Sequence, residues 1–284
     1  MSENVFQRAK RLNLPYNTLE LGYSKNVKDC NQRNFCNESI YMILKESYLK
    51  RIIEEKHLWF SLIIKAWEDP YELFLLKQKI DIEGHSLNNF FKNDIYRHYG
   101  QSWSTIKDSD ALWRIYSTNK KGVQIKTSVI KMINILNQTR ESMYMVPLFG
   151  KVKYLKQEEI SEWMKNELRN GSGYLWPALS DSLFIKRKEF EHEKEVRFII
   201  RTHEKSANTE RINIEYDHID IMVDNPFNFI EEIVLDPRLS EEEFLKRKEE
   251  LSSFTNEIPI VKSNLYAFTP LKFSIPETPL KLNI

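Results

Sequence analysis

The stretch EKEVRFIIR, residues 193–201, decides the fold class of this chain. Charged side chains alternate with apolar ones, which is the pattern of a half-buried β-strand. In such a strand Glu193, Glu195 and Arg197 share one face, about 7 Å from one to the next. Two carboxylates beside an arginine can take different roles in one site, because their surroundings differ. The alternative is a solvated strand face with a cross-strand ion pair.

The segment just before this strand, residues 184–192, is charged and irregular. It contains a basic cluster, Lys186-Arg187-Lys188, and Arg169 lies nearby in the sequence. Such a cluster can contact a nucleic acid or a diphosphate. It can equally be a solvated run of charges. We treat Lys186, Arg187 and Lys188 as candidate substrate-binding residues.

The rest of the chain mixes strand and helix patterns without an internal repeat or a flexible linker. Apolar alternation predicts strands over residues 39–44, 57–64, 103–106, 122–127, 151–155, 231–235 and 258–261. Helical spacing and capping residues predict helices over residues 46–56, from about 71, and over 108–117, 128–136, 158–168 and 240–254. Ser240 and Glu243 form a capping box at the last of these. The order predicts the α+β class, with a mixed β-sheet and flanking helices.

The domain organisation follows from composition along the chain. Residues 35–268 hold the periodic segments, and we expect them to form a single α+β domain. Residues 1–34 are polar and are interpreted as an N-terminal extension. Residues 269–284 contain Pro270, Pro276 and Pro279, which resist regular structure, and are interpreted as a C-terminal tail.

Overall composition excludes several classes of protein. Of the 284 residues, 41% are hydrophobic and 12% aromatic, which is too apolar for a disordered chain. Lys and Arg number 42 against 41 Asp and Glu, so a net charge of +1 provides no general attraction for a polyanion or an anionic membrane. No apolar run approaches the roughly 18 residues of a membrane helix, and the polar N-terminus lacks the core of a secretory signal. We expect a cytoplasmic protein without a membrane partner.

Common catalytic motifs are missing from the sequence. Neither a G-x-G-x-x-G nor a G-K-S/T loop occurs, which argues against Rossmann and P-loop phosphate binding. No two histidines have metal-ligand spacing, and no G-x-S-x-G elbow is present. Metal-dependent and serine-dependent hydrolysis are therefore not expected, and no metal ligands are assigned.

Two aromatic segments are further candidates for binding. Trp113-Arg114-Ile115-Tyr116-Ser117 follows Ser102-Trp103-Ser104-Thr105. Aromatic faces can stack on a nicotinamide or a base, and an arginine can bind a phosphate through two bonds. Alternatively, the three-residue spacing of Trp113 and Tyr116 is that of core packing.

The segment Trp67-x-Asp69-Pro70-x-Glu72 has two interpretations. It can be a rigid turn that directs two carboxylates into a pocket. Alternatively, Asp69 and Glu72 cap and charge the start of a helix.

Taken in chain order, four motifs resemble a bacterial domain-of-unknown-function family, the one numbered 2971. The resemblance covers roughly residues 39–268 and implies no activity by itself. Its motifs are Trp67-x-Asp69-Pro70-x-Glu72, Trp113–Ser117 with Gly122-Val123, Phe190-x-x-Glu193-x-Glu195-x-Arg197, and Val234-x-Asp236-Pro237-Arg238.

The late two-glutamate strand also resembles that of the ADP-ribosyltransferase superfamily, whose split sheet binds NAD. The resemblance implies that Glu195 is the catalytic glutamate and that Glu193 aligns the acceptor nucleophile. It implies Ser104 or Tyr116 as the middle-strand residue, and residues 186–192 as a loop that recognises the target. NAD is then the substrate, and no metal is needed.

The first strand departs from that superfamily pattern. Members place Arg or His there to hold the cofactor, and Ser39-Ile40-Tyr41-Met42-Ile43-Leu44 contains neither. Tyr41 can stack on the cofactor instead, or Arg97, His98 or Arg114 can hold its phosphates. The candidate cofactor-binding residues are Tyr41, Ser104, Trp113, Arg114, Tyr116 and Arg197.

These features lead to the hypothesis of an ADP-ribosyltransferase-like enzyme that transfers ADP-ribose from NAD to a protein or nucleic acid. A bacterial toxin or antiphage effector, with a cognate antitoxin, is the biological role that the resemblance implies. Two alternatives stay open at this point. One is a non-catalytic module that binds a nucleotide or a partner. The other is a protein that binds or processes nucleic acid through the basic cluster, with the acids holding a divalent ion.

Overall fold

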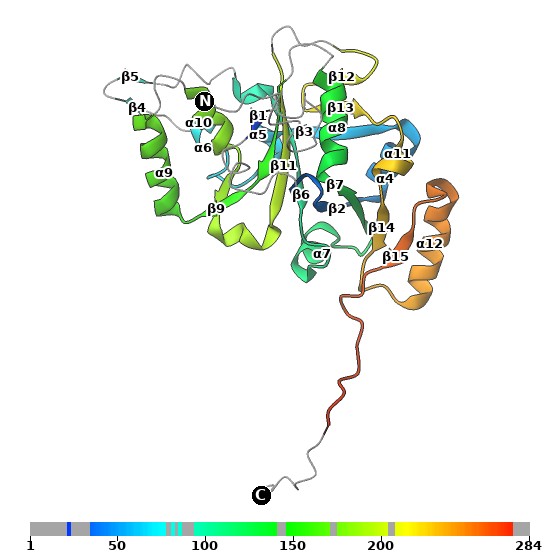
Figure 1. Cartoon of the computed structure of the whole chain (residues 1–284). Coiled ribbons are helices and arrows are strands. Elements are labelled where there is room, and N and C mark those ends of the chain that lie inside the picture. The colour runs from blue at the N-terminus through cyan, green and yellow to red at the C-terminus, as the bar shows by residue number, and fades with distance from the viewer. Residues whose placement is uncertain are drawn as a thin grey trace, which may run out of the picture.

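The computed structural model describes residues 22–23, 35–77, 81–82, 85–86, 94–140, 146–170, 175–203 and 208–274. This part of the chain forms a large mixed β-sheet flanked by helices, which confirms the predicted α+β class (Figure 1). The eleven strands of the sheet are β1 (Gly22–Tyr23), β2 (Ser39–Lys45), β3 (His57–Leu62), β6 (His98–Ser104), β7 (Gly122–Ser128), β8 (Val146–Lys151), β11 (Glu195–Arg201), β12 (Ile212–Ile214), β13 (His218–Met222), β14 (Glu232–Leu235) and β15 (Ile260–Lys262).

Two short strand pairs and the helices complete the described elements. The pairs are β4 (Asp81–Ile82) with β5 (His85–Ser86) and β9 (Lys153–Leu155) with β10 (Ile185–Arg187). The α-helices are α4 (Glu46–Lys50), α5 (Ile63–Ala66), α6 (Phe74–Lys77), α7 (Asp110–Tyr116), α8 (Val129–Arg140), α9 (Gln157–Asn170), α10 (Leu175–Ser182), α11 (Pro226–Phe229) and α12 (Glu241–Thr255). A π-helix, η2 (Arg51–Glu55), continues α4, and two 3-10 helices are η4 (Asp94–Arg97) and η5 (Lys188–Glu193).

The sheet splits at its central strand, β6. One edge of β6 pairs with β11 along its whole length. The other edge is shared: β3 pairs with Tyr99 and Gly100, whereas β2 pairs with Ser104. Residues 101–103 therefore pair with neither β2 nor β3, and the sheet divides into two arms there. One arm continues through β7, β14 and β15, and the other through β13 and β12.

Two hydrophobic clusters lie on opposite faces of β11, because alternate side chains of a strand point to opposite faces. Val196, Phe198 and Ile200 belong to the larger cluster, and Ile199 belongs to the smaller one. Every residue of β11 except Arg201 is buried. The prediction of a half-buried strand is therefore wrong, since a helical layer covers the face that was expected to meet solvent.

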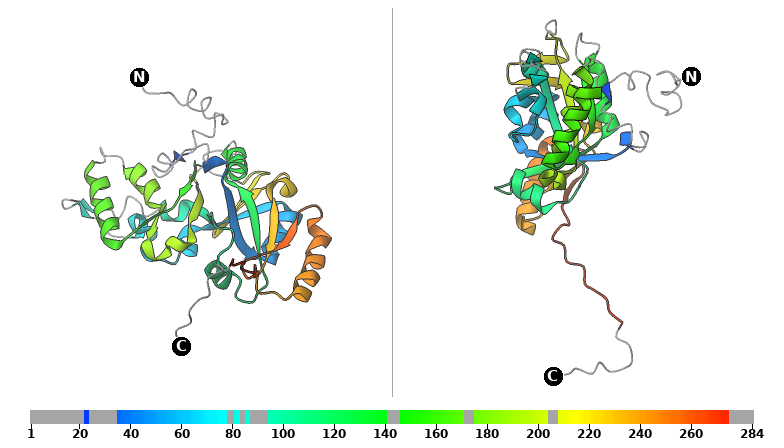
Figure 2. Two further views of the ribbon diagram at one scale, coloured as in Figure 1. Left: turned by 60° about the horizontal axis from the view of Figure 1, so that its bottom comes forward. Right: turned by 90° about the vertical axis from the view of Figure 1, so that its left-hand side faces the viewer.

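That helical layer contains α6, α9 and α10. Leu75, Ile160 and Leu179 from these helices pack with Ile185 of β10 in the smaller cluster. Figures 1 and 2 place α9 and α10 at one end of the molecule and α12 at the other.

Most predicted elements form close to their expected bounds. Ser109 caps α7, and Ser240 with Glu243 forms the predicted capping box of α12. Residues 151–155 form the end of β8 and the whole of β9 instead of one strand. The helix expected from about residue 71 is shorter, because residues 70–73 form a turn and Leu73 has a φ of 59°.

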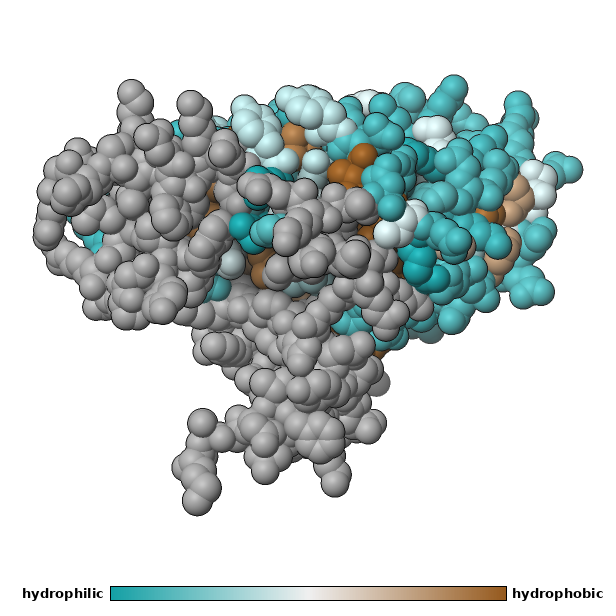
Figure 3. Space-filling view, turned by 90° about the horizontal axis from the view of Figure 1, so that it is seen from above, coloured by the Kyte–Doolittle hydropathy of each residue, from teal (hydrophilic) through white to brown (hydrophobic). Residues whose placement is uncertain are grey.

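The two ends of the chain are only partly described. Of the predicted extension, residues 1–21 and 24–34 lie outside the described residues, and so do residues 275–284 of the predicted tail. Residues 263–274 form neither helix nor strand, and the chain runs away from the sheet there (Figure 1). Figure 3 shows a mostly hydrophilic surface with scattered hydrophobic residues over the described atoms. None of the described helices has the length and apolar character needed to cross a membrane.

Candidate functional site

A cavity of about 930 Å³ lies where the sheet splits. Its walls come from both arms of the sheet, from the turn between α5 and α6, and from the segment between β10 and β11. The volume is in the range of pockets that hold cofactors and drug-sized ligands. This cavity is called the main cleft below.

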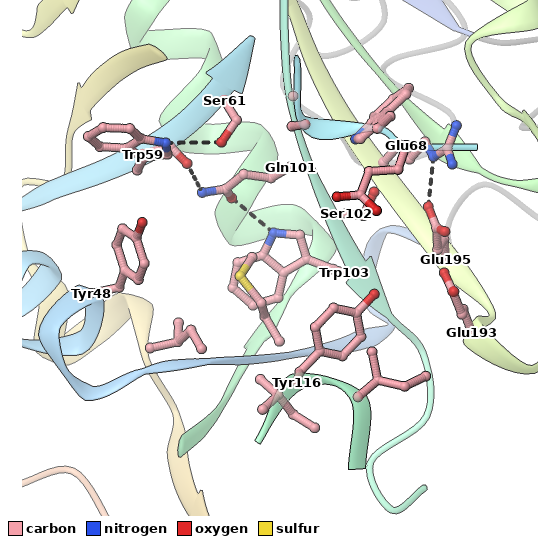
Figure 4. A pocket seen from close by; sticks show the side chains of 18 of the residues that line it. Tyr48, Trp59, Ser61, Glu68, Gln101, Ser102, Trp103, Tyr116, Glu193 and Glu195 are labelled. Atoms are coloured by element: carbon pink, nitrogen blue, oxygen red, sulfur yellow. Dashed lines mark hydrogen bonds and ion pairs between the residues drawn. The ribbon is translucent and has the colours of Figure 1, made fainter. Parts of the chain in front are cut away.

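One wall of the main cleft crosses the gap between β3 and β6 through side chains. Gln101 Nε2 donates to the Trp59 carbonyl oxygen over 2.6 Å, and Trp103 Nε1 donates to Gln101 Oε1 over 3.0 Å. Trp59 Nε1 in turn donates to Ser61 Oγ over 3.0 Å (Figure 4). These bonds replace the backbone pairing that is missing at residues 101–103. They also hold two indole rings at the cleft, with the phenol of Tyr48 nearby.

The opposite wall carries a buried network of charges. Lys186 Nζ lies 2.6 Å from Glu195 Oε1 and 2.8 Å from Glu193 Oε2. Arg197 Nε donates to Glu195 Oε2 over 2.7 Å, and Arg197 also forms an ion pair with Glu72. All five side chains are buried. The expectation of a solvated charge run does not hold for Lys186, which binds two carboxylates of the site.

Glu193 reaches this network from outside the strand. It ends η5, and Lys194, with a φ of 45°, turns the chain into β11. Ser104 Oγ donates to the Glu193 carbonyl oxygen over 2.8 Å, which ties this turn to β6. The prediction that Glu193 shares one strand face with Glu195 and Arg197 is therefore wrong. The two carboxylates meet through Lys186 instead.

The surroundings separate the pKa values of the two glutamates. Burial and a hydrogen bond with Glu195 raise the pKa of Glu193 to about 7. Burial acts in the same direction on Glu195, but the charges of Arg197 and Lys186 outweigh it and lower the pKa of Glu195 well below its usual range. Glu195 is thus permanently ionised, and Glu193 can exchange a proton near neutral pH. Such a pair suits acid–base chemistry around a developing positive charge.

Arg197 is held on every side. Beyond its two glutamates, its Nη1 donates to the Leu183 carbonyl oxygen over 2.8 Å. The guanidinium also lies 4.0 Å from the ring centroid of Trp67. Only 1% of Arg197 is exposed. Arg197 lines the main cleft, but its guanidinium is already engaged by Glu72, Glu195 and the Leu183 carbonyl oxygen, so its contacts in this structure position Glu195.

The turn at Asp69 directs carboxylates inward, as one of the two interpretations of that segment predicted. Asp69 accepts from the backbone N–H of Tyr71 over 3.0 Å and forms an ion pair with Arg187 over 3.0 Å. Glu72 is buried against Arg197. The helix-capping interpretation is wrong here, because α6 begins only at Phe74.

A smaller cavity of about 220 Å³ adjoins the two glutamates and is called the small pocket below. It collects three of the predicted residues, Tyr41 of β2, Ser104 of β6 and Tyr116 of α7. Tyr116 also lines the main cleft (Figure 4). The structure thus brings these three residues together with Glu193 and Glu195.

Three other predicted residues lie outside both cavities. Trp113 is fully buried in the protein interior, as the core-packing alternative predicted. Arg114 is exposed and pairs with Asp110, and Lys188 is exposed and pairs with Glu191. Arg187 differs from these, because it lines the main cleft and keeps 29% of its side chain exposed. The side chain of Arg169 lies outside the described residues.

Two of the family motifs meet in a structural clamp away from the cavities. Ser117 Oγ donates to Asp236 Oδ2 over 2.7 Å and accepts from the backbone N–H of Gly122 over 3.1 Å. Arg238 binds Asp236 and donates to the Trp113 carbonyl oxygen over 3.1 Å. The contacts of Ser117, Asp236 and Arg238 therefore connect α7 to β14, and none of these three residues lines either cavity.

Sequence reasoning missed several residues that shape the cavities. Trp59 and Gln101 line the main cleft, and Gln124 of β7 lines the small pocket. Both glutamines stand in strands that are otherwise largely buried, and a polar residue in such a strand is the signal that could have found them. Among the described residues, no group of three or more His, Cys, Asp or Glu side chains is arranged to hold a metal ion.

These features define a mixed α+β protein whose sheet splits beside a cleft with a carboxylate pair. A family model described as "Protein of unknown function (DUF2971)" matches residues 112–198, from α7 into β11. The resemblance to this family is thereby confirmed over those residues, which include Tyr116, Lys186, Glu193 and Glu195. No curated protein matches the sequence.

The chain is also similar to solved structures of a DarT protein from Thermus sp. 2.9. For the complex with NAD+, the TM-score is 0.33 and the identity 13%, and the match covers 80% of this chain and 96% of that chain. For the complex with ADP-ribosylated ssDNA, the TM-score is 0.35 and the identity 14%, with 81% and 95% covered.

Proposed function

We propose that this protein cleaves the bond between nicotinamide and ribose in NAD and transfers ADP-ribose to a macromolecular acceptor. The observation that carries the proposal is the pair Glu193 and Glu195, which share Lys186 at the main cleft and differ widely in pKa. The resemblance of the two-glutamate segment to ADP-ribosyltransferases supports it.

Glu195 is suited to the transition state of this reaction. When the C1′–N bond breaks, its electron pair passes to the ring nitrogen, nicotinamide leaves as a neutral molecule, and positive charge develops on the ribose. An ionised carboxylate held in place stabilises such a charge more in the transition state than in the ground state. Lys186 binds one lone-pair site on Oε1 of Glu195, and Arg197 binds one on Oε2. A carboxylate has about four such sites, so others remain. Glu195 can therefore also accept a bond from a ribose hydroxyl.

Glu193 is suited to act as the general base for the acceptor nucleophile. Its pKa of about 7 means that a substantial fraction is ionised at neutral pH. The acceptor nucleophile forms the new bond to C1′ with its own electron pair, and its proton passes to the Glu193 carboxylate. A general base works best with a pKa near the working pH. The transfer then balances, with nicotinamide and the ADP-ribosylated acceptor as products.

The remaining lining offers places for the rest of NAD. Tyr48 presents aromatic surface for the adenine, and its ring contacts the edge of Trp59, which stacks on His218. Arg51 and Arg187 line the main cleft with 25% and 29% of their side chains exposed, and we assign the diphosphate to them. They stand in for the Arg or His that the strand 39–44 lacks.

The test is incubation of purified protein with NAD labelled on the adenylate, with cell protein, RNA and DNA offered separately. We expect label on one acceptor class, and we expect Glu195→Gln to reduce the transfer roughly 100-fold or more. Glu191→Gln is the matched control, since Glu191 lies outside both cavities and pairs with Lys188 and Lys194 at the surface. Thermal melting of each variant confirms that it folds.

Two results would overturn the proposal. Full transfer by Glu195→Gln would remove the catalytic assignment. If the wild-type protein transfers no label and releases no nicotinamide, the non-catalytic binding module becomes the better interpretation. The labelled class in a positive experiment identifies the acceptor, and a role as a toxin or antiphage effector stays a prediction that depends on it.

A further inference from the structure

The small pocket beside Glu193 and Glu195 has its own shape and its own lining. Its volume of about 220 Å³ is below the usual range for drug-sized ligands, so it suits a single ring. Tyr41 and Tyr116 supply aromatic surface, and Gln124 supplies a buried polar group. Tyr116 and both glutamates also line the main cleft, so a ligand that occupies both cavities passes beside the carboxylates.

In the side-chain amide of Gln124, the nitrogen has a hydrogen-bond partner and the oxygen does not. Only 2% of the residue is exposed. Its Nε2 donates to the Lys107 carbonyl oxygen over 2.7 Å. This bond settles the orientation of the amide, because the reversed orientation would place two oxygens against each other. Gln124 Oε1 has no hydrogen-bond partner among the described residues, and a buried acceptor in this state favours a ligand that donates an N–H.

Two other polar groups of the small pocket, the hydroxyls of Ser104 and Tyr116, have different surroundings. Ser104 Oγ donates to the Glu193 carbonyl oxygen and accepts from the backbone N–H of Ile106 over 3.0 Å. Partial burial and the negative charges of Glu193 and Glu195 raise the pKa of Tyr116 to about 12, so its hydroxyl stays protonated. Gln124 Oε1 is thus a neutral, buried acceptor of the lining without a hydrogen-bond partner among the described residues.

We propose that the small pocket is a subsite for a neutral planar ring with an N–H donor, and that Gln124 Oε1 selects it by accepting that hydrogen bond. This inference rests on the proposed function, under which the ring is the nicotinamide of NAD and the donor is its carboxamide. The ring lies between Tyr41 and Tyr116, and the ribose lies next to Glu195. Gln124 is then a specificity-determining residue for the leaving group.

The experiment compares free nicotinamide with 3-acetylpyridine, which has the same ring and carbonyl but no N–H donor. Binding to the wild-type protein is measured by isothermal titration calorimetry. We expect nicotinamide to bind at least 10-fold more tightly than 3-acetylpyridine, because only nicotinamide bonds to Gln124 Oε1. Equal affinities in the wild-type protein overturn the proposal without any need for a variant.

A variant then assigns the preference to one residue. Gln124→Met keeps a side chain of similar length and removes the acceptor, so the difference between the two ligands should disappear. Gln157→Met, at the exposed start of α9 and outside both cavities, is the matched control and should keep the difference. A preference that survives Gln124→Met contradicts the assignment to Gln124.

The failure of this proposal and the failure of the proposed function have different signatures. If nicotinamide binds through Gln124 but NAD is not turned over, the subsite stands and the transferase proposal fails. If NAD is turned over but nicotinamide binding does not depend on Gln124, the subsite fails alone. Adenine serves as a third ligand, and tighter Gln124-dependent binding of adenine than of nicotinamide overturns the nicotinamide assignment.

Discussion

Arg197 Nε lies 2.7 Å from Glu195 Oε2, two residues earlier on the same face of β11. Both side chains are buried, so little solvent is available to replace a lost partner. Together with Glu72 and Lys186, they fix the position of a carboxylate at the edge of the main cleft. The arrangement links the stability of the fold directly to the geometry of the site, and the first prediction tests that link.

Arg197→Met should destabilise the protein by about 3–5 kcal/mol, because it removes the guanidinium that pairs with both Glu72 and Glu195 and leaves Lys186 as the cation beside these buried carboxylates. Urea unfolding at pH 7 measures the loss. Arg114→Met is the control, since Arg114 is an exposed arginine that pairs with Asp110 at the surface, and its loss should change the free energy of unfolding by less than about 1 kcal/mol. An unchanged unfolding midpoint for Arg197→Met would show that the buried network does not hold the site together.

Glu193 should make the stability depend on pH. The pKa of Glu193 in the folded protein, about 7, lies above the ordinary value of 4.5. Its contribution to the free energy of unfolding is therefore complete below pH 4.5 and is lost as the pH rises through 7. Glu195 has a lowered pKa, and its contribution is already complete above pH 4.5. Between pH 5 and pH 8, the wild-type protein should therefore lose more stability than Glu193→Gln does, by an amount of the order of 2 kcal/mol. If the free energy of unfolding of the two proteins changed with pH in the same way, the raised pKa of Glu193 would be contradicted.

Gly122→Ala should destabilise the clamp between α7 and β14. A Cβ at residue 122 would lie 2.8 Å from Ser117 Cβ and 2.9 Å from Ser117 Oγ, so Ser117 must move away from Asp236. We expect a cost of about 1–3 kcal/mol, typical of overpacking in a well-packed interior. Thermal melting measures it, and a wild-type melting temperature would count against a role for this clamp.

Ser240→Ala should cost about 1 kcal/mol, because it removes the acceptor for the backbone N–H of Glu243 at the start of α12. Ser252→Ala is the comparison within the same helix, since Ser252 Oγ bonds only to the Lys248 carbonyl oxygen at an exposed position. In chemical unfolding, the free energy of unfolding of Ser240→Ala should be clearly lower than that of Ser252→Ala. Equal stabilities would mean that the capping box contributes little.

Local patterns predicted the elements that depend on neighbours in sequence. Alternation located β2, β3 and β7, and the spacing of Ser240 and Glu243 located the start of α12. Such features are visible in a sequence because a strand, a cap or a helix face repeats over two to four residues. The same reasoning failed at Glu193, where a turn with a positive φ at Lys194 interrupts the alternation.

The sequence by itself determined the α+β class and the segment, residues 186–197, that carries the candidate site. Only the tertiary structure decided what the charges of that segment do. Glu72 stands 125 residues before Arg197, and its approach depends on the turn between α5 and α6 and on the helical layer of α6, α9 and α10. That layer excludes water from one face of β11, so a pattern typical of a solvated strand becomes a buried ion network. Burial of this kind is a property of packed surfaces distant in sequence, and no local spacing encodes it.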